Sequence, residues 1–379
     1  MLIKNEIIYL DYNSTTPIDP RVFDTMMPYL KDNYANPSST HHFGQSINEK
    51  VKQAREQIAE FINAEPKEII FTSGATEAIN LAIKGIAENY SGKGKHIITV
   101  STEHKAVIDT CKYLESKGYE ITYLPVQPNG LIDLAVFEQS LRPDTILVSV
   151  MYVNNETGVI QPIKEIASIT HKKGVLFMTD ATQAVGKIAV DVDDLGVDIL
   201  SFSGHKMYAP KGIGALFVSQ RGNKIKLTPQ IHGGGHEQGL RSGTLNVPGI
   251  IALGKACEIA SQEIFDNQAK IYDLRNILEV QLLKLPKTSL NCDSENRIFN
   301  TTNICFNGKD ANVMIGRMKN IAVSNGSACS SAVIEPSYVL KAMGLSDEDA
   351  FASIRFSLGK YNTNEDIETI VNKIKVVTQ

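Results

Sequence analysis

Short apolar runs alternate with longer stretches of helical spacing between about residue 65 and residue 220. The longer stretches include 77–87 and 163–173, which place their apolar residues on one helical face. Apolar strands that alternate with helices are typical of a mainly parallel sheet covered on both faces. The pattern predicts an α/β fold, with strands at 68–72, 96–101, 120–126, 145–152, 175–179, 199–202 and 213–218.

The last third of the chain has a different pattern. A long helical stretch at 248–285 precedes a strand-like run at 303–306, a loop rich in Gly, Ser and Ala at 324–331, and an alternating strand at 353–358. A final helix is predicted to begin at the capping box formed by Thr363 and Asp366. We predict a large domain over 15–255 and a smaller α+β domain formed by 1–14 with 256–379.

Composition excludes several classes of protein. The 379 residues carry 38 Lys+Arg and 42 Asp+Glu, a formal net charge of -4, which argues against direct nucleic-acid binding. Lys4, Asn5 and Glu6 interrupt the N-terminal apolar block, and no apolar run approaches the roughly 18 residues that span a bilayer. Five cysteines, none in a CxxC pair, argue against disulfides and a metal knuckle. We expect a cytoplasmic protein without a metal or membrane partner.

Polar residues gather at the ends of the predicted strands, where open parallel sheets bind ligands. A helix starts near Thr76 with free backbone amides suited to a phosphate, and His104, Asp180 and Lys206 end later strands. Taken singly, these are typical of capped turns and surface side chains. Together they fit pyridoxal phosphate (PLP), which needs a lysine for a Schiff base, an acid at the ring nitrogen and a phosphate cradle.

Several motifs carry a resemblance to a known family. They are LDYNSTTP (10–17), TSGATE (72–77), TEH (102–104), NNETG (154–158), DATQ (180–183), SFSGHK (201–206), RSGT (241–244) and GSAC (326–329). In order along the chain they resemble the class V aminotransferase superfamily and, more narrowly, the cysteine desulfurases of the NifS/IscS type. The resemblance implies the aspartate-aminotransferase-like PLP fold type I and a homodimer with its sites at the subunit interface.

The resemblance also implies roles for individual residues. Lys206 forms the Schiff base, His104 stacks on the ring and relays protons, and Asn155 lies near ring and substrate. Arg355 binds the substrate carboxylate, although from its strand pattern alone Arg355 reads as a solvated residue. The remaining cofactor contacts are Asp180 to the pyridine nitrogen, Gln183 to the phenolic oxygen, and Ala75, Thr76, Ser203, His205 and the partner subunit's Thr244 to the phosphate.

Cys329 distinguishes between reaction types. Its small polar neighbours predict an exposed thiol on a loop, and an isolated cysteine of this kind is usually incidental. The GSAC motif instead implies a nucleophile: its thiolate takes the sulfur of L-cysteine, giving L-alanine and a persulfide on Cys329. An acceptor protein then takes the sulfur for iron–sulfur cluster assembly, tRNA thiolation or DNA phosphorothioation. Asn325 differs from the residue that the family motif has at this position. The segment after the last helix is shorter than in housekeeping family members, which favours a sulfur acceptor other than the usual iron–sulfur scaffold protein.

Three other functions stay open at this point. A selenocysteine lyase or a transaminase shares the fold, and Cys329 would separate these two enzymes from a desulfurase. A non-catalytic sulfur-carrier platform would bind partners without reacting, and the intact Lys206, Asp180 and His104 argue against it.

Overall fold

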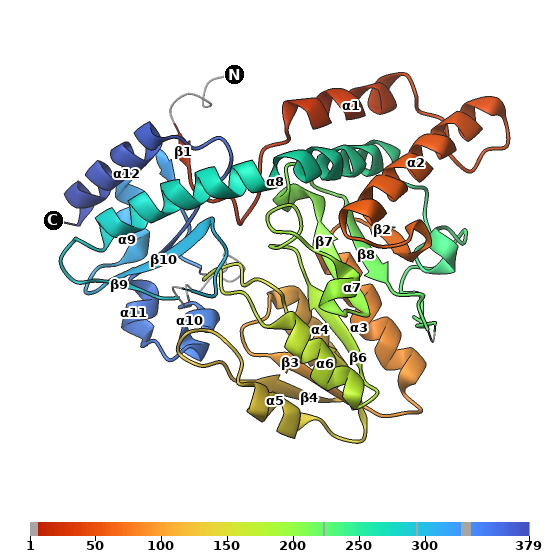
Figure 1. Cartoon of the computed structure of the whole chain (residues 1–379), viewed down its shortest axis with the longest axis horizontal. Coiled ribbons are helices and arrows are strands. Elements are labelled where there is room, and N and C mark those ends of the chain that lie inside the picture. Colours follow the sequence, from red (N-terminus) through yellow and green to blue (C-terminus); the bar gives the residue numbers. More distant parts are fainter. Residues whose placement is uncertain (1–6, 223, 293–294, 327–334, 379) are drawn as a thin grey trace.

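The computed structural model describes residues 7–222, 224–292, 295–326 and 335–378 (Figure 1). The α-helices are α1 (Pro20–Lys31), α2 (His42–Phe61), α3 (Ala75–Tyr90), α4 (Lys105–Glu115), α5 (Leu134–Ser140), α6 (Ile163–Lys172), α7 (Val192–Leu195), α8 (Val247–Leu282), α9 (Ala311–Arg317), α10 (Tyr338–Ala342), α11 (Asp347–Phe351) and α12 (Asn364–Val377). The strands are β1 (Ile8–Tyr9), β2 (Ile69–Thr72), β3 (His96–Val100), β4 (Glu120–Leu124), β5 (Thr145–Ser149), β6 (Leu176–Asp180), β7 (Ile199–Ser203), β8 (Gly214–Val218), β9 (Thr288–Leu290), β10 (Thr301–Phe306), β11 (Ile321–Ala322) and β12 (Ser353–Ser357).

The large sheet has the order β2-β8-β7-β6-β5-β3-β4. Strands β7, β6, β5, β3 and β4 pair in parallel, whereas β8 is antiparallel to both β7 and β2. The segment between β7 and β8 is too short for a helical crossover, so β8 returns beside β7 in the opposite direction. The predicted α/β class is confirmed, and each predicted strand of this sheet lies within a few residues of an observed one.

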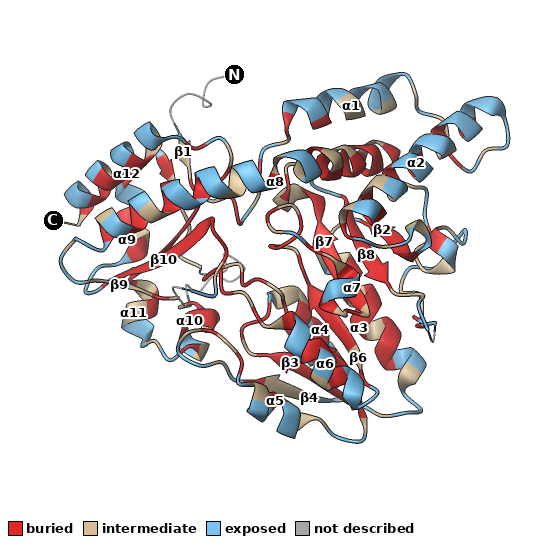
Figure 2. Ribbon diagram, in the orientation of Figure 1, coloured by how far each residue is buried: buried red, intermediate tan, exposed pale blue. Residues whose placement is uncertain are grey.

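Helices cover both faces of this sheet because successive strand residues point to opposite sides. Ile70 and Ile97 pack with α3 and α4 on one face, and Phe71 and Ile98 pack with α2, α6 and α8 on the other. Figure 2 shows the resulting pattern, with buried strands between helices that expose only their outer faces. Because strands β2, β3, β5, β7 and β8 are buried throughout, polar side chains at the ends of the central strands are held by a rigid core.

A smaller α+β part is built around the antiparallel sheet β12-β10-β9, as predicted. The N-terminal strand β1 joins it by pairing in parallel with β11. Helix α12 begins at Thr363, where the predicted capping box with Asp366 is present. Helix α8 runs without a break past residue 255, with one half against α1 and α2 and the other against α12 and β10 (Figure 1). The domain boundaries stay a prediction.

None of the helices in the described ranges is both long and apolar enough to cross a lipid bilayer.

Candidate active site

A cavity of about 580 Å³ opens at the carboxyl ends of β6 and β7, between the start of α3 and strand β12. This is the edge at which parallel sheets bind ligands. The predicted residues that line the cavity are Ala75, Thr76, His104, Asn155, Asp180, Gln183, Ser203, His205, Lys206 and Arg355. Residues far apart in the sequence therefore meet in one place, as the strand-end pattern predicts.

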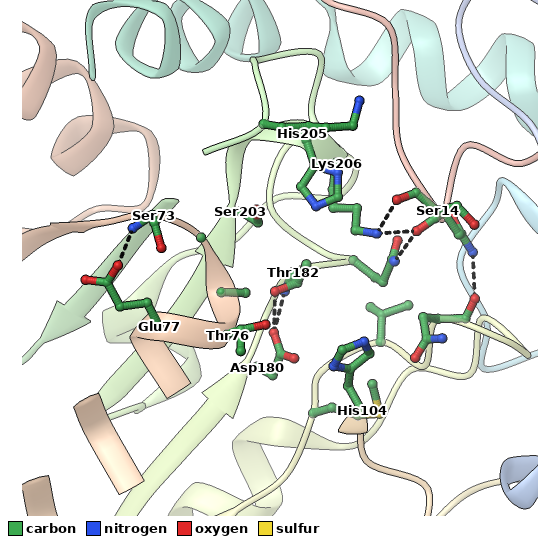
Figure 3. A pocket seen from close by; sticks show the side chains of 18 of the residues that line it. Ser14, Ser73, Thr76, Glu77, His104, Asp180, Thr182, Ser203, His205 and Lys206 are labelled. Atoms are coloured by element: carbon green, nitrogen blue, oxygen red, sulfur yellow. Dashed lines mark hydrogen bonds between the residues drawn. The ribbon is translucent and has the colours of Figure 1, made fainter. Parts of the chain in front are cut away.

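Lys206 ends a short 3-10 turn, Gly204–Lys206, that follows β7. Its Nζ donates to the carbonyl oxygens of Asn13 at 2.7 Å and Ser14 at 2.6 Å, so the amine points into the cavity (Figure 3). Burial lowers the pKa of Lys206 to about 8, and the positive charge of Arg355 acts in the same direction. A much larger share of this amine is unprotonated near neutral pH than in an exposed lysine, and only that form attacks a carbonyl.

Asp180 is the last residue of β6, and the chain turns immediately after it. Its Oδ1 accepts hydrogen bonds from the backbone N–H of Thr182 at 3.0 Å and from the Thr182 hydroxyl (Figure 3). Next along this turn, Gln183 donates from Nε2 to the Asn13 carbonyl at 2.9 Å and accepts from Nζ of the buried Lys187. The turn thus holds an acid and an amide side by side in fixed orientations.

The start of helix α3 forms the opposite wall. No side chain of the described residues caps this helix at Gly74, so the amides of its first turn face the cavity. A Cβ added at Gly74 would lie 3.4 Å from Ser203 Oγ, which places that hydroxyl beside the helix start. Burial lowers the pKa of His205 to about 4, which keeps its ring neutral. Amides, hydroxyls and the helix dipole make this wall suitable for a phosphate.

His104 caps helix α4, and its Nδ1 accepts from the backbone N–H of Ala106 at 3.1 Å. Burial lowers the pKa of His104 and the Lys206 charge lowers it further, although Asp180 opposes the shift. The neutral ring therefore carries its proton on Nε2. A flat, oriented, neutral imidazole is suited to stacking on an aromatic cofactor.

Arg355 on β12 is only 4 % exposed, so the sequence-pattern reading of a solvated side chain is wrong. Strand β12 pairs with β10 on one side and with Asp11 and Ser324 on the other, and Arg355 lines the cavity instead of extending into water. Nη2 donates to Asp11 Oδ1 at 2.6 Å and Ser14 Oγ at 2.8 Å, and Nη1 donates to the Asn155 carbonyl at 2.9 Å. Arg355 Nε is buried and finds no acceptor among the described residues, which leaves a donor for a ligand carboxylate.

Two predicted residues are not found in this cavity. Thr244 is exposed and does not line it, and Cys329 lies outside the described residues. Asn13 lies within the LDYNSTTP motif but was not predicted as a site residue. Asn13 accepts from Lys206, Gln183 and Lys187 and donates to the hydroxyl of Thr301 on β10. Only the folded structure shows that this N-terminal residue joins the two sheets at the cavity.

Comparison with known proteins identifies the family. The class V aminotransferase family model matches residues 8–370, and the chain belongs to this family. The cysteine desulfurase IscS of Methylococcus capsulatus is 52 % identical over 369 residues, 97 % of this chain and 91 % of the relative. A solved NifS-like protein has 38 % identity and a TM-score of 0.92 over 98 % of this chain and 99 % of its own. A structure described as SspA in complex with cysteine has 40 % identity and a TM-score of 0.81, covering 94 % and 99 %.

These findings confirm the predicted PLP fold type I, and the cavity fits the cofactor of this family. The orphaned Nε of Arg355, the uncapped start of α3 and the inward amine of Lys206 each offer a group that a PLP-bound substrate would satisfy. When bound, PLP withdraws electrons from the substrate Cα through its protonated ring. Asp180 would hold that ring proton, and Lys206 would hold the cofactor covalently.

Proposed function

We propose that the protein is a cysteine desulfurase, which converts L-cysteine to L-alanine and transfers the sulfur to Cys329. The observation that carries the proposal is the meeting of Lys206, Asp180 and Arg355 in one cavity: an amine of lowered pKa, a fixed acid and a carboxylate binder. The identity with a cysteine desulfurase, and the similarity to a protein solved in complex with cysteine, favour this activity over a transaminase or a selenocysteine lyase on the same fold.

Each residue has a defined task in this reaction. Arg355 binds the substrate carboxylate, which places the Cα hydrogen near Lys206, and the free amine of Lys206 removes that proton. The Cys329 thiolate then forms a sulfur–sulfur bond with the substrate. The carbon–sulfur bond breaks with its electron pair left on the β-carbon, which takes up a proton, and Lys206 returns the removed proton to Cα. His104 is placed to move protons, and L-alanine and a Cys329 persulfide are the balanced products.

The surface around α1 supports a homodimer. Side chains that would ordinarily be buried are exposed there, namely Phe23, Leu30 and Tyr34, and Tyr34 is 76 % exposed. A second copy of the chain would cover such a patch. Thr244, exposed and outside the cavity of its own chain, would then be available to the partner's phosphate site. Light scattering on the native protein and on a Leu30→Glu variant tests this proposal, with a dimer expected only for the native protein.

The destination of the sulfur is an acceptor protein. Iron–sulfur cluster assembly and nucleic-acid thiolation are both candidate destinations, and the match of IscS-type relatives over most of the chain supports the former. We propose that the protein works in the cytoplasm. Free thiols at Cys111, Cys257, Cys292 and Cys305 fit a reducing compartment.

The decisive experiment measures alanine and sulfide after L-cysteine and a thiol reductant are added to the PLP-loaded protein. We expect equal amounts of both, and loss of both in Cys329→Ser. Cys292→Ser is the control for removal of a thiol and should retain the native rate. If Cys329→Ser still releases alanine at the native rate, the selenocysteine lyase or transaminase is favoured. If the native protein binds no PLP, the non-catalytic platform is favoured.

A further inference from the structure

Glu156 is a fully buried carboxyl group to which the sequence analysis assigned no role. It follows Asn155 in the cavity wall, on the loop between β5 and α6, and it is 3 % exposed. Its backbone is held at both ends: the N–H donates to Asn154 Oδ1 at 2.9 Å, and the carbonyl accepts from Asn303 Nδ2 at 3.1 Å. Because β10 carries Asn303, Glu156 lies at the junction between the two sheets.

A single carboxylate oxygen of Glu156 meets both flanks of the segment that contains Cys329. On one flank, Ser337 Oγ donates to Glu156 Oε2 at 2.5 Å and accepts from Leu340 N–H at 3.2 Å as the cap of α10. On the other flank, a Cβ added at Gly326 would collide with the same Oε2 and lie 3.6 Å from the Ser337 Cβ. Gly326 and Ser337 therefore lie against one carboxylate, and residues 327–334 between them are outside the described ranges.

Burying this carboxyl group has a cost that the fold alone does not require. Burial raises the pKa of Glu156 to about 7, although the Ser337 hydroxyl and the charge of Arg355 oppose the shift. An uncharged side chain of similar size would pack at the same place without a desolvation penalty. The geometry instead indicates a task that needs a hydrogen-bond acceptor on the third carbon beyond Cα.

We propose that Glu156 is a positioning residue that fixes both flanks of the Cys329 segment to the loop bearing Asn155, and so sets the approach of the thiol to the substrate sulfur. This inference rests on the proposed desulfurase activity. The proposed role predicts different effects on two steps of the reaction, because the two steps depend on different residues. Removal of the Cα proton needs Lys206 and Arg355, which Glu156 does not hold by a hydrogen bond. Formation of the sulfur–sulfur bond needs Cys329 in place.

The test uses two glycines with nearly the same positive φ. Gly326 has φ +72° and Gly308 has φ +77°, so an alanine at either position is strained to a similar degree. At Gly308 no atom of the described residues, apart from its chain neighbours, lies within 4 Å of the added Cβ, whereas at Gly326 the Cβ meets Glu156. The difference between Gly326→Ala and Gly308→Ala therefore reports on the contact with the carboxylate.

Two rates are measured on the PLP-loaded variants. One is exchange of the L-cysteine Cα hydrogen for deuterium, which needs no thiol from the protein. The other is single-turnover formation of the Cys329 persulfide, trapped by alkylation. Displacement of a reacting group by ~1 Å costs up to about 100-fold. In Gly326→Ala we expect persulfide formation to fall by roughly 10–100-fold, with exchange within about twofold of native. Gly308→Ala should keep both rates.

Side-chain variants keep the test valid if Gly326→Ala does not fold. Glu156→Asp shortens the reach to Ser337 and should show the same selective loss, whereas Glu156→Gln keeps an acceptor at the same place and should recover most of the rate. The proposal is overturned if Gly326→Ala and Gly308→Ala lose persulfide formation equally, if Glu156→Asp keeps the native rate, or if exchange and persulfide formation fall together. A native protein that catalyses neither reaction would contradict the proposed function itself.

Discussion

The pKa of Lys206 makes a quantitative prediction about how the protein captures its cofactor. With a pKa of about 8 instead of 10.5, the free amine is roughly 10 % of the total at pH 7, against ~0.03 % for an ordinary lysine. Schiff-base formation needs the free amine, so Lys206 should react ~300-fold faster at this pH than an exposed lysine of equal intrinsic reactivity. The rate should rise about tenfold per pH unit and level off above pH 8.

The assay follows the visible absorbance after PLP is mixed with protein from which the cofactor has been removed, over a series of pH values. The same measurement with Nα-acetyl-lysine, whose ε-amine is free, corrects for the ionisation of PLP itself. Arg355→Gln removes a positive charge that lowers the pKa of Lys206, so its plateau should begin at higher pH than in the native protein. If the native rate instead rises in parallel with Nα-acetyl-lysine beyond pH 10, burial does not lower the pKa and the reasoning is wrong.

Two further variants test the proposed role of Asp180 and the stability contributed by the Glu279–Arg297 ion pair. Asp180→Asn keeps the hydrogen bonds from Thr182 but loses the charge, so it should retain PLP while turnover of L-cysteine falls by about 10²–10³-fold; near-native turnover would contradict the role of the acid. Glu279→Ala leaves the buried Arg297 guanidinium without its bidentate partner and should lower the free energy of unfolding, measured with denaturant, by about 3–5 kcal/mol. The control Asp109→Ala, which removes an exposed ion pair, should lower it by less than ~1 kcal/mol.

The sequence was most informative where the hydrophobic period was strict. Helix α12 begins at the predicted capping box, because its cap is a local interaction between Thr363 and Asp366. The direction of β8 was not predictable in the same way, since strand direction depends on which neighbour the chain reaches. Lys206 and Asp180 were predicted because strand ends converge at one edge. Asn13 and Glu156 were missed because their partners lie on β10, on α10 and in distant loops.

The cavity draws on both extremes of the polypeptide. Asp11 and Asn13 near the beginning, and Arg355 near the end, meet beside the lysine amine. A ribosome must therefore release nearly the whole chain before the cavity is complete. Chains that end before β12 keep the residues assigned to the cofactor but lack Arg355, so they should fail to hold the carboxylate of an amino acid.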